Sequence, residues 1–315
     1  MNPALPVFSS ASPSAHAAGP LVSLFACAIV LTCLAPAALA IPIVDLGTAS
    51  GFSILAGSQI TDAGGSSTIV TGNVGLYPTT GAAIGLTAGQ VSGGTIYTAE
   101  TSGALLNGAQ NDLTTAYNDA AARPVTIDFG VVDNQLGGQT LFPGVYRFGH
   151  AATANLIGTL TLDANGDLNP VWLFEATSDL ITAASAPGAA GSSVVLLNGA
   201  SSCDVFWQVG SSATIGTYSD FVGHIMADQS IALQAYATLD GSALARIAAV
   251  TLDHNTITAS DCSGDNGGGG DNGGGGATVP DTSSTLLLLG TGLAGLAAFG
   301  RRSLSTLNNF SAKSA

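Results

Sequence analysis

The sequence is poor in charged and aromatic residues. Only 8% of its 315 residues are charged and 6% are aromatic, whereas about 25% of the residues in an ordinary globular domain are charged. Twenty acidic residues stand against six basic ones, lysine occurs once, at Lys313, and the formal net charge is −14. Nucleic-acid binding is therefore not expected, because no basic surface is available to neutralise phosphates. With 46% hydrophobic residues, the chain is also too apolar for a charge-rich disordered protein.

The residue combinations that catalysis requires are missing as well. His150, His224 and His254 lie far apart in the sequence, and neither a G-x-S-x-G elbow nor a phosphate loop ending in Gly-Lys-Ser/Thr occurs. The two glutamates, Glu100 and Glu175, are expected to be solvated or capping residues. We predict that the protein is not an enzyme and uses no cofactor, because no nucleophile is paired with a base.

The amino terminus has the pattern of an export signal. Residues 20–40 form an apolar run that ends in Ala38-Leu39-Ala40, and small residues at these positions match a signal-peptidase site. Residues 1–20 contain no Lys or Arg, which departs from the usual positive start of such a signal. We predict a signal peptide over residues 1–40, removed by signal peptidase; an uncleaved membrane anchor is the alternative.

The carboxyl terminus has three successive parts. A Gly/Asn/Asp-rich linker (263–278) precedes a segment (279–302) with Val279-Pro280-Asp281, an apolar stretch and Arg301-Arg302, and a polar tail (303–315) follows. Fourteen apolar residues fall short of the roughly 20 of a stable membrane span. This arrangement resembles the PEP-CTERM class of sorting signals in its VPD variant. The resemblance implies transient membrane association, cleavage near Val279 by an exosortase-type enzyme, and a secreted or cell-surface protein; a permanent C-terminal anchor is the alternative.

Residues 41–262 remain as one predicted folded domain. Cys27 and Cys33 fall in the signal peptide, whereas Cys203 and Cys262 stay in the domain. Two cysteines in an oxidising compartment predict one disulfide, with two separate buried thiols as the alternative. No metal site is predicted, because a metal would need more ligands at closer spacing.

Within this domain the hydrophobic pattern predicts many short strands and one helix. Apolar runs such as Phe52–Ala56 and Ile69–Val74 are separated by Gly, Ser and Thr turns, which is typical of β-strands. A helix over about residues 99–123 is predicted because apolar and small residues recur there at helical spacing, and Pro124 ends it. These residues are Leu105, Leu106, Ala109, Leu113, Ala116, Tyr117 and Ala120.

The last third of the domain contains a loose repeat. Ala213–Gly216 is echoed 24 residues later by Ala237–Asp240, and Phe221–Ala227 is echoed by Leu244–Val250. A period in the low twenties with short strands is typical of a β-solenoid, in which successive strands stack about 4.8 Å apart. The long helix is expected to pack along the side of the stack.

Five blocks of the sequence carry a resemblance to a known family. They are QNDLTTAYNDAAAR (Gln110–Arg123), TLFPGVYRF (Thr140–Phe148), LTLDANGDLNPVWLF (Leu160–Phe174), VFWQVGSSATIGT (Val205–Thr217) and GSALARIAAVTLDHNTI (Gly241–Ile257). In the same order, these blocks resemble those of the DUF3494 ice-binding proteins. The resemblance covers about residues 43–258 and implies a discontinuous right-handed β-helix of triangular cross-section with one long α-helix alongside. It also implies adsorption to ice through a flat face.

A rigid flat array of Thr, Ser and Ala orders water, because hydroxyls anchor the water and methyl groups restrain it. Gln234 and Tyr236 would interrupt the array if either projected from the flat face. The alternative function is a cell-surface or matrix adhesin whose solenoid binds glycan or protein, for which exposed Tyr236, Trp172 or Trp207 beside a cleft would be the sign. The candidate ice-binding residues, chosen as hydroxyl residues in or beside predicted strands, are Thr61, Thr182, Thr214, Thr217, Ser230 and Thr238.

One segment has some of the features of a calcium-binding loop. Asp163, Asn165, Asp167 and Asn169 alternate as the oxygen ligands of a calcium loop would, but Phe174 stands where that loop needs its last glutamate. Asn-Gly is a strong turn signal, so a hairpin-like turn at Asn165-Gly166 is predicted in place of a metal site.

Overall fold

The computed structural model describes residues 41–129, 134–149, 153–189, 191–260 and 262. The chain divides into two units, Met1–Ser260 and Asp261–Ala315, and the fold below is that of the first. The predicted signal peptide, linker, sorting motif and polar tail lie outside the described residues. Within the described ranges, no helix has both the length and the apolar character needed to cross a membrane.

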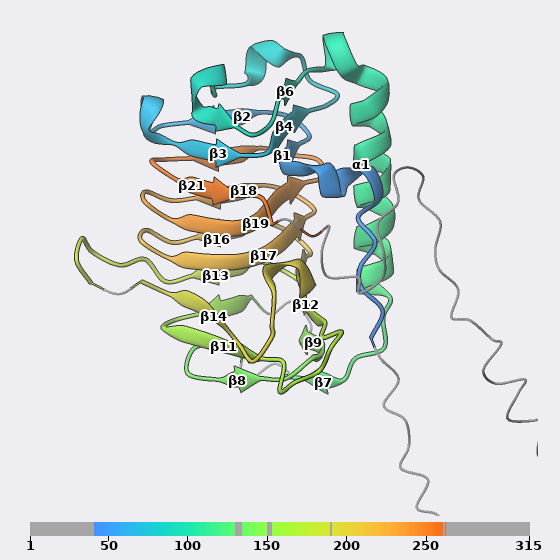
Figure 1. The fold of residues 1–315 in the computed structure, drawn as a ribbon, viewed down its shortest axis with the longest axis vertical. Coiled ribbons are helices and arrows are strands. Elements are labelled where there is room, and N and C mark those ends of the chain that lie inside the picture. The colour runs from blue at the N-terminus through green and yellow to red at the C-terminus, as the bar shows by residue number, and fades with distance from the viewer. Residues whose placement is uncertain (1–40, 130–133, 150–152, 190, 261, 263–315) are drawn as a thin grey trace, which may run out of the picture. The chain divides into compact units, whose positions relative to one another are not determined.

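The fold is mainly β, with one α-helix among the described residues and parallel strand pairs (Figure 1). The strands stack in three columns, each made of the corresponding sides of successive coils. The first column is a six-stranded sheet in the order β10 (Ala154–Leu156), β13 (Leu180–Thr182), β16 (Ala213–Ile215), β18 (Ile231–Leu233), β20 (Val250–Leu252) and β2 (Ile60–Asp62).

The other two columns share β17 (Asp220–Ala227) and β19 (Thr238–Ala245), whose eight residues run from one column into the next. The second column also contains β8 (Thr140–Leu141), β11 (Thr159–Asp163), β14 (Ser193–Leu197), β21 (Thr256–Thr258), β3 (Ile69–Thr71) and β5 (Val91–Ser92). The third also contains β7 (Ile127–Asp128), β9 (Gly144–Phe148), β12 (Trp172–Ala176), β15 (Val205–Val209), β1 (Phe52–Ala56), β4 (Asn73–Leu76) and β6 (Ile96–Tyr97).

The order of coils in the stack differs from their order in the chain. Strands β1, β2 and β3, near the start of the domain, pair with β19, β20 and β21 near its end. The long helix α1 (Ala99–Ala121) connects the amino-terminal coil to β7 at the other end of the stack, from which the later coils build back (Figure 1). The amino-terminal coils are therefore joined to the last coils of the domain by strand pairs between residues about 190 positions apart, such as Thr61 and Thr251.

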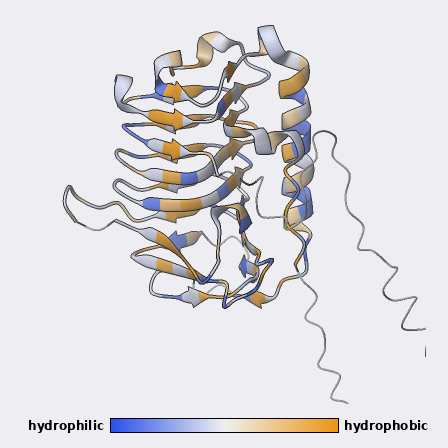
Figure 2. Ribbon diagram, viewed as in Figure 1, coloured by the Kyte–Doolittle hydropathy of each residue, from blue (hydrophilic) through white to orange (hydrophobic). Residues whose placement is uncertain are grey.

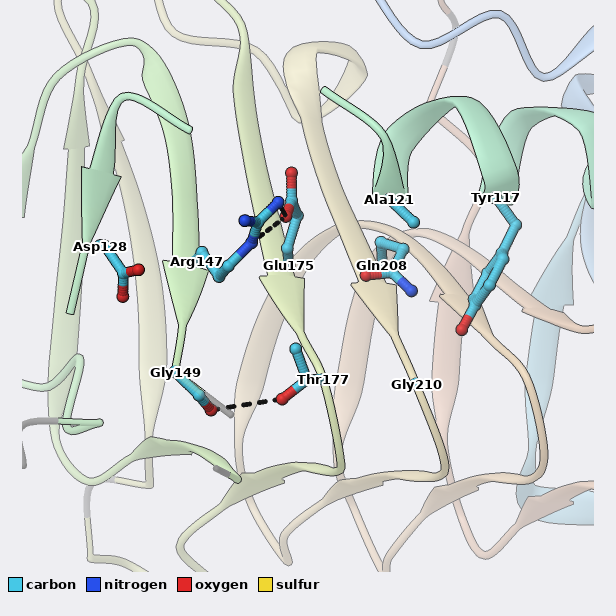
Figure 3. Close-up of a pocket in the computed structure, with 9 residues that line it drawn as sticks. All are labelled: Tyr117, Ala121, Asp128, Arg147, Gly149, Glu175, Thr177, Gln208 and Gly210. Atoms are coloured by element: carbon cyan, nitrogen blue, oxygen red, sulfur yellow. Dashed lines mark hydrogen bonds and ion pairs between the residues drawn. The ribbon is translucent and has the colours of Figure 1, made fainter. Parts of the chain in front are cut away.

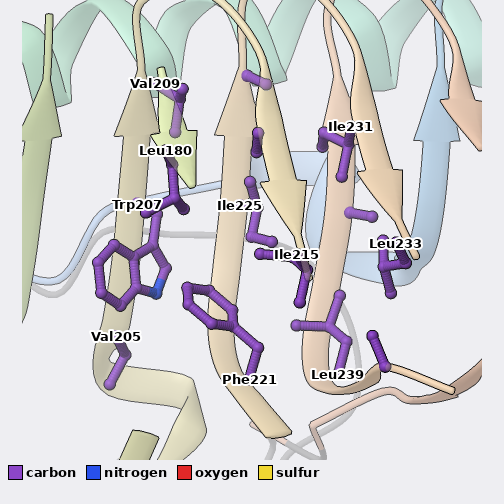
Figure 4. Close-up of a cluster of buried hydrophobic side chains, with 14 of the residues drawn as sticks. Leu180, Val205, Trp207, Val209, Ile215, Phe221, Ile225, Ile231, Leu233 and Leu239 are labelled. Carbon is purple, nitrogen blue, oxygen red and sulfur yellow. The ribbon is translucent and has the colours of Figure 1, made fainter. Parts of the chain in front are cut away.

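Alternation of side chains along each strand fills the interior of the coils. Apolar residues recur in the strands of successive coils (Figure 2), and the inward ones are buried. Aromatic rings stack from coil to coil: the centroid of Trp207 lies 4.1 Å from that of Phe174 and 4.9 Å from that of Phe221. Around Trp207 and Phe221 the space is filled by aliphatic side chains such as Ile225 (Figure 4).

Helix α1 covers the third column. The side chains it buries lie at helical spacing and pack against outward-facing residues of that column, so helix and sheet form a second apolar cluster. Leu105, which the spacing also placed on the buried face, is 41% exposed. The buried helix residues are Leu106, Ala109, Leu113, Ala116 and Ala120, and their sheet partners include Leu55, Leu173, Phe206, Met226 and Leu244.

Short 3-10 helices occupy several corners and connections. They are η1 (Gly47–Gly51), η2 (Gly65–Ser67), η3 (Gly81–Ala83), η4 (Ala88–Gln90) and η5 (Ser202–Asp204).

Two sequence predictions about the strands are wrong. The repeat is set by pairs such as Asp220 with Thr238 and Phe221 with Leu239, an offset of 18 residues in place of 24. Small residues occur so often here that letter similarity alone does not fix the register. The turn at Asn165-Gly166 does not form a hairpin either, because β11 pairs in parallel with β8 and β14 while β12 pairs with β9 and β15.

The helix contact can be tested by comparing Leu113→Ala with Leu105→Ala. Leu113 is completely buried, so its truncation leaves a cavity and should lower the free energy of unfolding by about 2–5 kcal/mol. Leu105 points toward solvent, and its truncation should change that energy by less than about 0.5 kcal/mol. Urea titration followed by circular dichroism measures both, and equal losses would contradict this packing.

Candidate functional site

The first column presents a row of six uncharged side chains to solvent. Each occupies the middle of a three-residue strand, and the strand pairings place them directly beside one another. We call this set the central row. In order along the sheet it consists of Asn155, Ile181, Thr214, Ala232, Thr251 and Thr61.

The local sequence explains why these side chains point outward. In β16, Ala213 and Ile215 are buried on either side of the half-exposed Thr214, and an alternating strand must turn its middle residue the other way. Backbone hydrogen bonds hold the neighbouring coils in register: the Ala213 amide donates to the Ser230 carbonyl at 2.9 Å, and the Ile231 amide to the Ala249 carbonyl at 2.9 Å. The central row is thus positioned by the backbone as well as by its own packing.

One edge of the central row contains small polar residues and one carboxylate. Ser230 is half-buried, and its amide donates to Ser212 Oγ at 3.3 Å. The Asp179 carboxylate accepts hydrogen bonds from the Ser212 amide and from Ser178 Oγ, both at 3.1 Å. The charge at this edge is therefore held at the ends of strands, beside the row rather than within it.

The opposite edge turns a corner that carries a stack of rings. Tyr218, Tyr236 and His254 follow β16, β18 and β20, with φ values of 58°, 62° and 55°, and their ring centroids lie 5.0 and 4.9 Å apart. Tyr236 is 48% exposed but belongs to this corner. Gln234, also at this edge, accepts a hydrogen bond from Thr217 Oγ1 at 3.4 Å, so neither Gln234 nor Tyr236 lies in the central row.

The structure separates the six predicted ice-binding residues. Thr61 and Thr214 lie in the central row, Ser230 lies at one edge, Thr217 lies in the turn at the other edge, and Thr238 lies on the second column.

The prediction of Thr182 as an ice-binding residue is wrong, because its side chain faces the interior of the coils. Its side chain is 2% exposed, and Oγ1 accepts a hydrogen bond from the Gly216 amide at 2.7 Å and lies 2.9 Å from Ser219 Oγ. Choosing only hydroxyl residues also missed Asn155, Ile181 and Ala232, and the choice among the hydroxyl residues missed Thr251. Alternation within aligned strands would have found all four.

The second column is also exposed and has more threonines, but charge interrupts it. Thr256 and Thr258 are both exposed on β21, and Thr238 lies beside them in register. The exposed Asp220 and Asp240 occupy the equivalent positions on β17 and β19, and Thr238 Oγ1 donates to Asp220 Oδ1 at 2.8 Å. A carboxylate orients water around its own charge, which makes this column a poorer template for an ordered layer.

The third column is covered, and it buries a histidine. His224 is 7% exposed, its Nδ1 lies 2.8 Å from Ser242 Oγ, and its ring stacks 5.3 Å from that of Phe206. Burial disfavours the charged form and lowers the pKa of His224 to about 4. Near neutral pH this residue is uncharged and acts as part of the packed wall.

The predicted calcium-like segment has the geometry of a turn. Asn165 and Gly166 have φ values of 49° and 80°, and Asp163 Oδ1 accepts hydrogen bonds from the Asn165 amide at 2.8 Å and from Asn198 Nδ2 at 2.7 Å. The side-chain oxygen of Asp163 is therefore used within the protein to hold this turn against the neighbouring coil.

The predicted cysteine and tryptophan features are also placed. Cys203, in η5, and Cys262 are both disulfide-bonded. Of the three aromatic residues named for the adhesin alternative, Trp172 and Trp207 are buried at 0% and 1% exposure, whereas Tyr236 is exposed at the corner beside the central row.

Comparison with known families decides the relationship that the fold suggests. The family model described as Ice-binding-like matches residues 54–258. The chain belongs to the ice-binding-like family. A second model, described as the VPDSG-CTERM motif, matches residues 278–303, which include Val279-Pro280-Asp281, so both predicted resemblances are confirmed.

Individual members of the ice-binding-like family match over most of their length. An ice-binding protein of Nostoc sp. (strain HG1) is 39% identical over 259 residues, covering 82% of this chain and 87% of that protein. An ice-binding protein of Colwellia sp. is 36% identical over 225 residues, covering 69% of this chain and 83% of that protein. Neither name supports the adhesin alternative.

Solved structures of ice-binding proteins share the fold. The crystal structure of an ice-binding protein from the Antarctic ascomycete Antarctomyces psychrotrophicus gives a TM-score of 0.62 at 37% identity, covering 70% of this chain and 100% of that chain. The DUF3494 domain of Shewanella frigidimarina ice-binding protein 1 gives a TM-score of 0.63 at 29% identity, covering 71% of this chain and 100% of that chain. The ice-binding-like fold, mainly β with a helix alongside, is thereby established.

The buried histidine predicts a specific dependence of stability on pH. The unfolded chain binds a proton at His224 near pH 6.5, whereas the folded protein does so only near pH 4, so the contribution of His224 to stability is complete above pH 6.5 and is lost as the pH falls toward 4. Between pH 7.5 and 4.5 the wild type should lose about 2–3 kcal/mol more free energy of unfolding than His224→Gln. Urea titrations at the two pH values measure this difference, and parallel losses would show that His224 is not the group responsible.

Proposed function

We propose that this protein is exported and adsorbs to ice through the central row of the first column. The observation that carries the proposal is the row itself: six aligned positions without an ionisable side chain, on a column that α1 does not cover. The relatives are named ice-binding proteins, which favours ice as the ligand of this chain as well. Thr61 and Thr214 are the predicted residues retained in this proposal, with Ser230 as an edge residue.

The row supplies both kinds of group that an ordered water layer needs. Hydroxyls of Thr214, Thr251 and Thr61 donate hydrogen bonds to water and accept them from it. The methyl groups of Ile181 and Ala232 restrain the anchored water molecules from rearranging. Strand stacking repeats these groups at about 4.8 Å. Each contact is weak, but the array is rigid before it binds, so little conformational entropy is lost on adsorption.

We infer that the coil is right-handed and triangular in cross-section, as the resemblance implies. Crossovers between parallel strands of one sheet are right-handed in nearly all proteins, and three columns of strands fit three sides. A flat side, rather than a concave groove, is the shape that a crystal plane requires.

We also infer the route of export. The proposed order is removal of residues 1–40 by signal peptidase, transient membrane association of the apolar stretch within residues 279–302, and cleavage by an exosortase-type enzyme near Val279-Pro280-Asp281. The matched motif over residues 278–303 supports the last step. The functional domain is then residues 41–262, released or retained at the cell surface, where it acts by adsorption without catalysis.

The choice of column is tested by two matched substitutions, Thr214→Tyr and Thr258→Tyr. Both replace a solvent-facing threonine by a bulky ring, one in the central row and one on the second column. Thr214→Tyr should reduce ice-recrystallisation inhibition and thermal hysteresis by about an order of magnitude, because many weak contacts act together. Thr258→Tyr should retain wild-type activity.

Three results would refute parts of this proposal. A wild-type domain (41–262) without activity at high concentration would exclude ice binding. Loss of activity in Thr258→Tyr alone would move the ice-binding surface to the second column. Equal activity in all three proteins would exclude both columns at these positions.

A further inference from the structure

A polar pocket opens on the third column where helix α1 ends. Its volume is about 460 Å³, which lies within the range of small-molecule sites in proteins. Residues of α1, β7, β9, β12 and β15 line it (Figure 3). The polar side chains around it are Tyr117, Asp128, Arg147, Glu175, Thr177 and Gln208.

The pocket interrupts an otherwise apolar ladder. Outward positions on β17, β19 and β1 carry Met226, Leu244 and Leu55, which pack under α1. The same ladder continues in register through Gln208 and Glu175 to Arg147. Apolar side chains at these positions would have extended the cluster. Gln208 hydrogen-bonds Tyr117 of the helix, but the Arg147–Glu175 pair adds no apolar contact to it.

Glu175 is the central residue of the pocket. The residue is only 2% exposed, and its Oε2 accepts hydrogen bonds from Arg147, with Nε at 2.8 Å and a terminal nitrogen at 2.7 Å. Its Oε1 is buried and has no hydrogen-bond partner among the described residues. Leaving a buried carboxylate oxygen unpaired is costly, so the pocket offers a strong acceptor to any ligand that carries a donor.

The charges around Glu175 restrict the class of ligand. Asp128 and Glu175 both carry carboxylates, which disfavour an anion. Arg147 is paired directly with Glu175, which disfavours a metal ion or an organic cation at the same place. A neutral ligand that both donates and accepts hydrogen bonds remains, since hydroxyl groups complement a carboxylate, a guanidinium and the amide of Gln208 together.

We propose that this pocket binds one sugar residue or a small polyol of similar size. One ligand hydroxyl donates to Glu175 Oε1, and adjacent ligand oxygens accept from Arg147 and Gln208. The site lies on the third column, away from the central row, so it is independent of ice adsorption and its failure would leave the proposed function intact.

The test uses the purified exported protein and four probes: D-glucose, D-galactose, D-mannose and myo-inositol. Saturation-transfer NMR and calorimetry should detect saturable binding of at least one probe, with a Kd of about 1 mM or lower. Glu175→Gln keeps the shape of the side chain but removes the acceptor charge, and should weaken binding at least about tenfold. A polysaccharide ending in the same sugar distinguishes a glycan terminus from a free sugar as the natural source.

A second variant guards against misfolding of Glu175→Gln. Ala121 is an exposed helix residue at the pocket rim, so Ala121→Trp should block binding without disturbing the core. Ala104→Trp, also on an exposed helix position, is the matched control and should bind like the wild type. Ice activity should be unchanged in all these variants.

Several outcomes would overturn the proposal. These are no saturable binding of any of the four probes, equal affinity in the wild type and Ala121→Trp, or preferential binding of tetramethylammonium over the sugars. Binding that is lost equally in Ala104→Trp and Ala121→Trp would also exclude the pocket as the site.

Discussion

The parallel hydrogen-bond register between successive coils is the constraint on which the rest of this structure depends. It decides which residue of each strand faces the interior and which faces solvent, so a shift by one residue would exchange the two sets. The bend that β17 and β19 share shows how closely the backbones approach in this register. Gly223 and Gly241 lie side by side there with φ of 109° and 144°, and a Cβ on Gly241 would lie 2.1 Å from the Gly223 carbonyl oxygen.

With the register fixed, the three columns take different tasks. The third column is apolar over most of its length and is covered by α1 through residues such as Leu113 and Met226. The second column exposes Asp220 and Asp240, which belong to the excess of acidic over basic residues in the sequence. The first column presents the uncharged central row. The low proportion of charged residues in the sequence is thus expressed on this one surface.

The sequence predicted the kinds of elements better than their alignment. The helix was predictable because its apolar residues recur at helical spacing and Pro124 follows it. The offset between coils was not, since Ala, Thr, Gly and Ser recur too often for a repeat of letters to identify the paired strands. Thr182 was misplaced for a different reason: a threonine is expected at the surface, but its position in β13 turns its side chain inward.

Other features could not be inferred from the sequence at all. Glu175, expected to be a solvated or capping residue, is buried against Arg147, because residues 28 positions apart meet only through strand pairing. The corner stack of Tyr218, Tyr236 and His254 likewise exists only because one residue per coil adopts the same left-handed conformation.

The central claim is that an uncharged central row, and no other exposed row, contacts ice. Incorporation of purified protein into slowly growing ice measures this contact directly. Ala232→Asp places a carboxylate in the middle of the row and should reduce incorporation to the level of a protein that does not bind ice, whereas Asp240→Asn on the second column should leave incorporation unchanged. Full incorporation of Ala232→Asp would contradict the account.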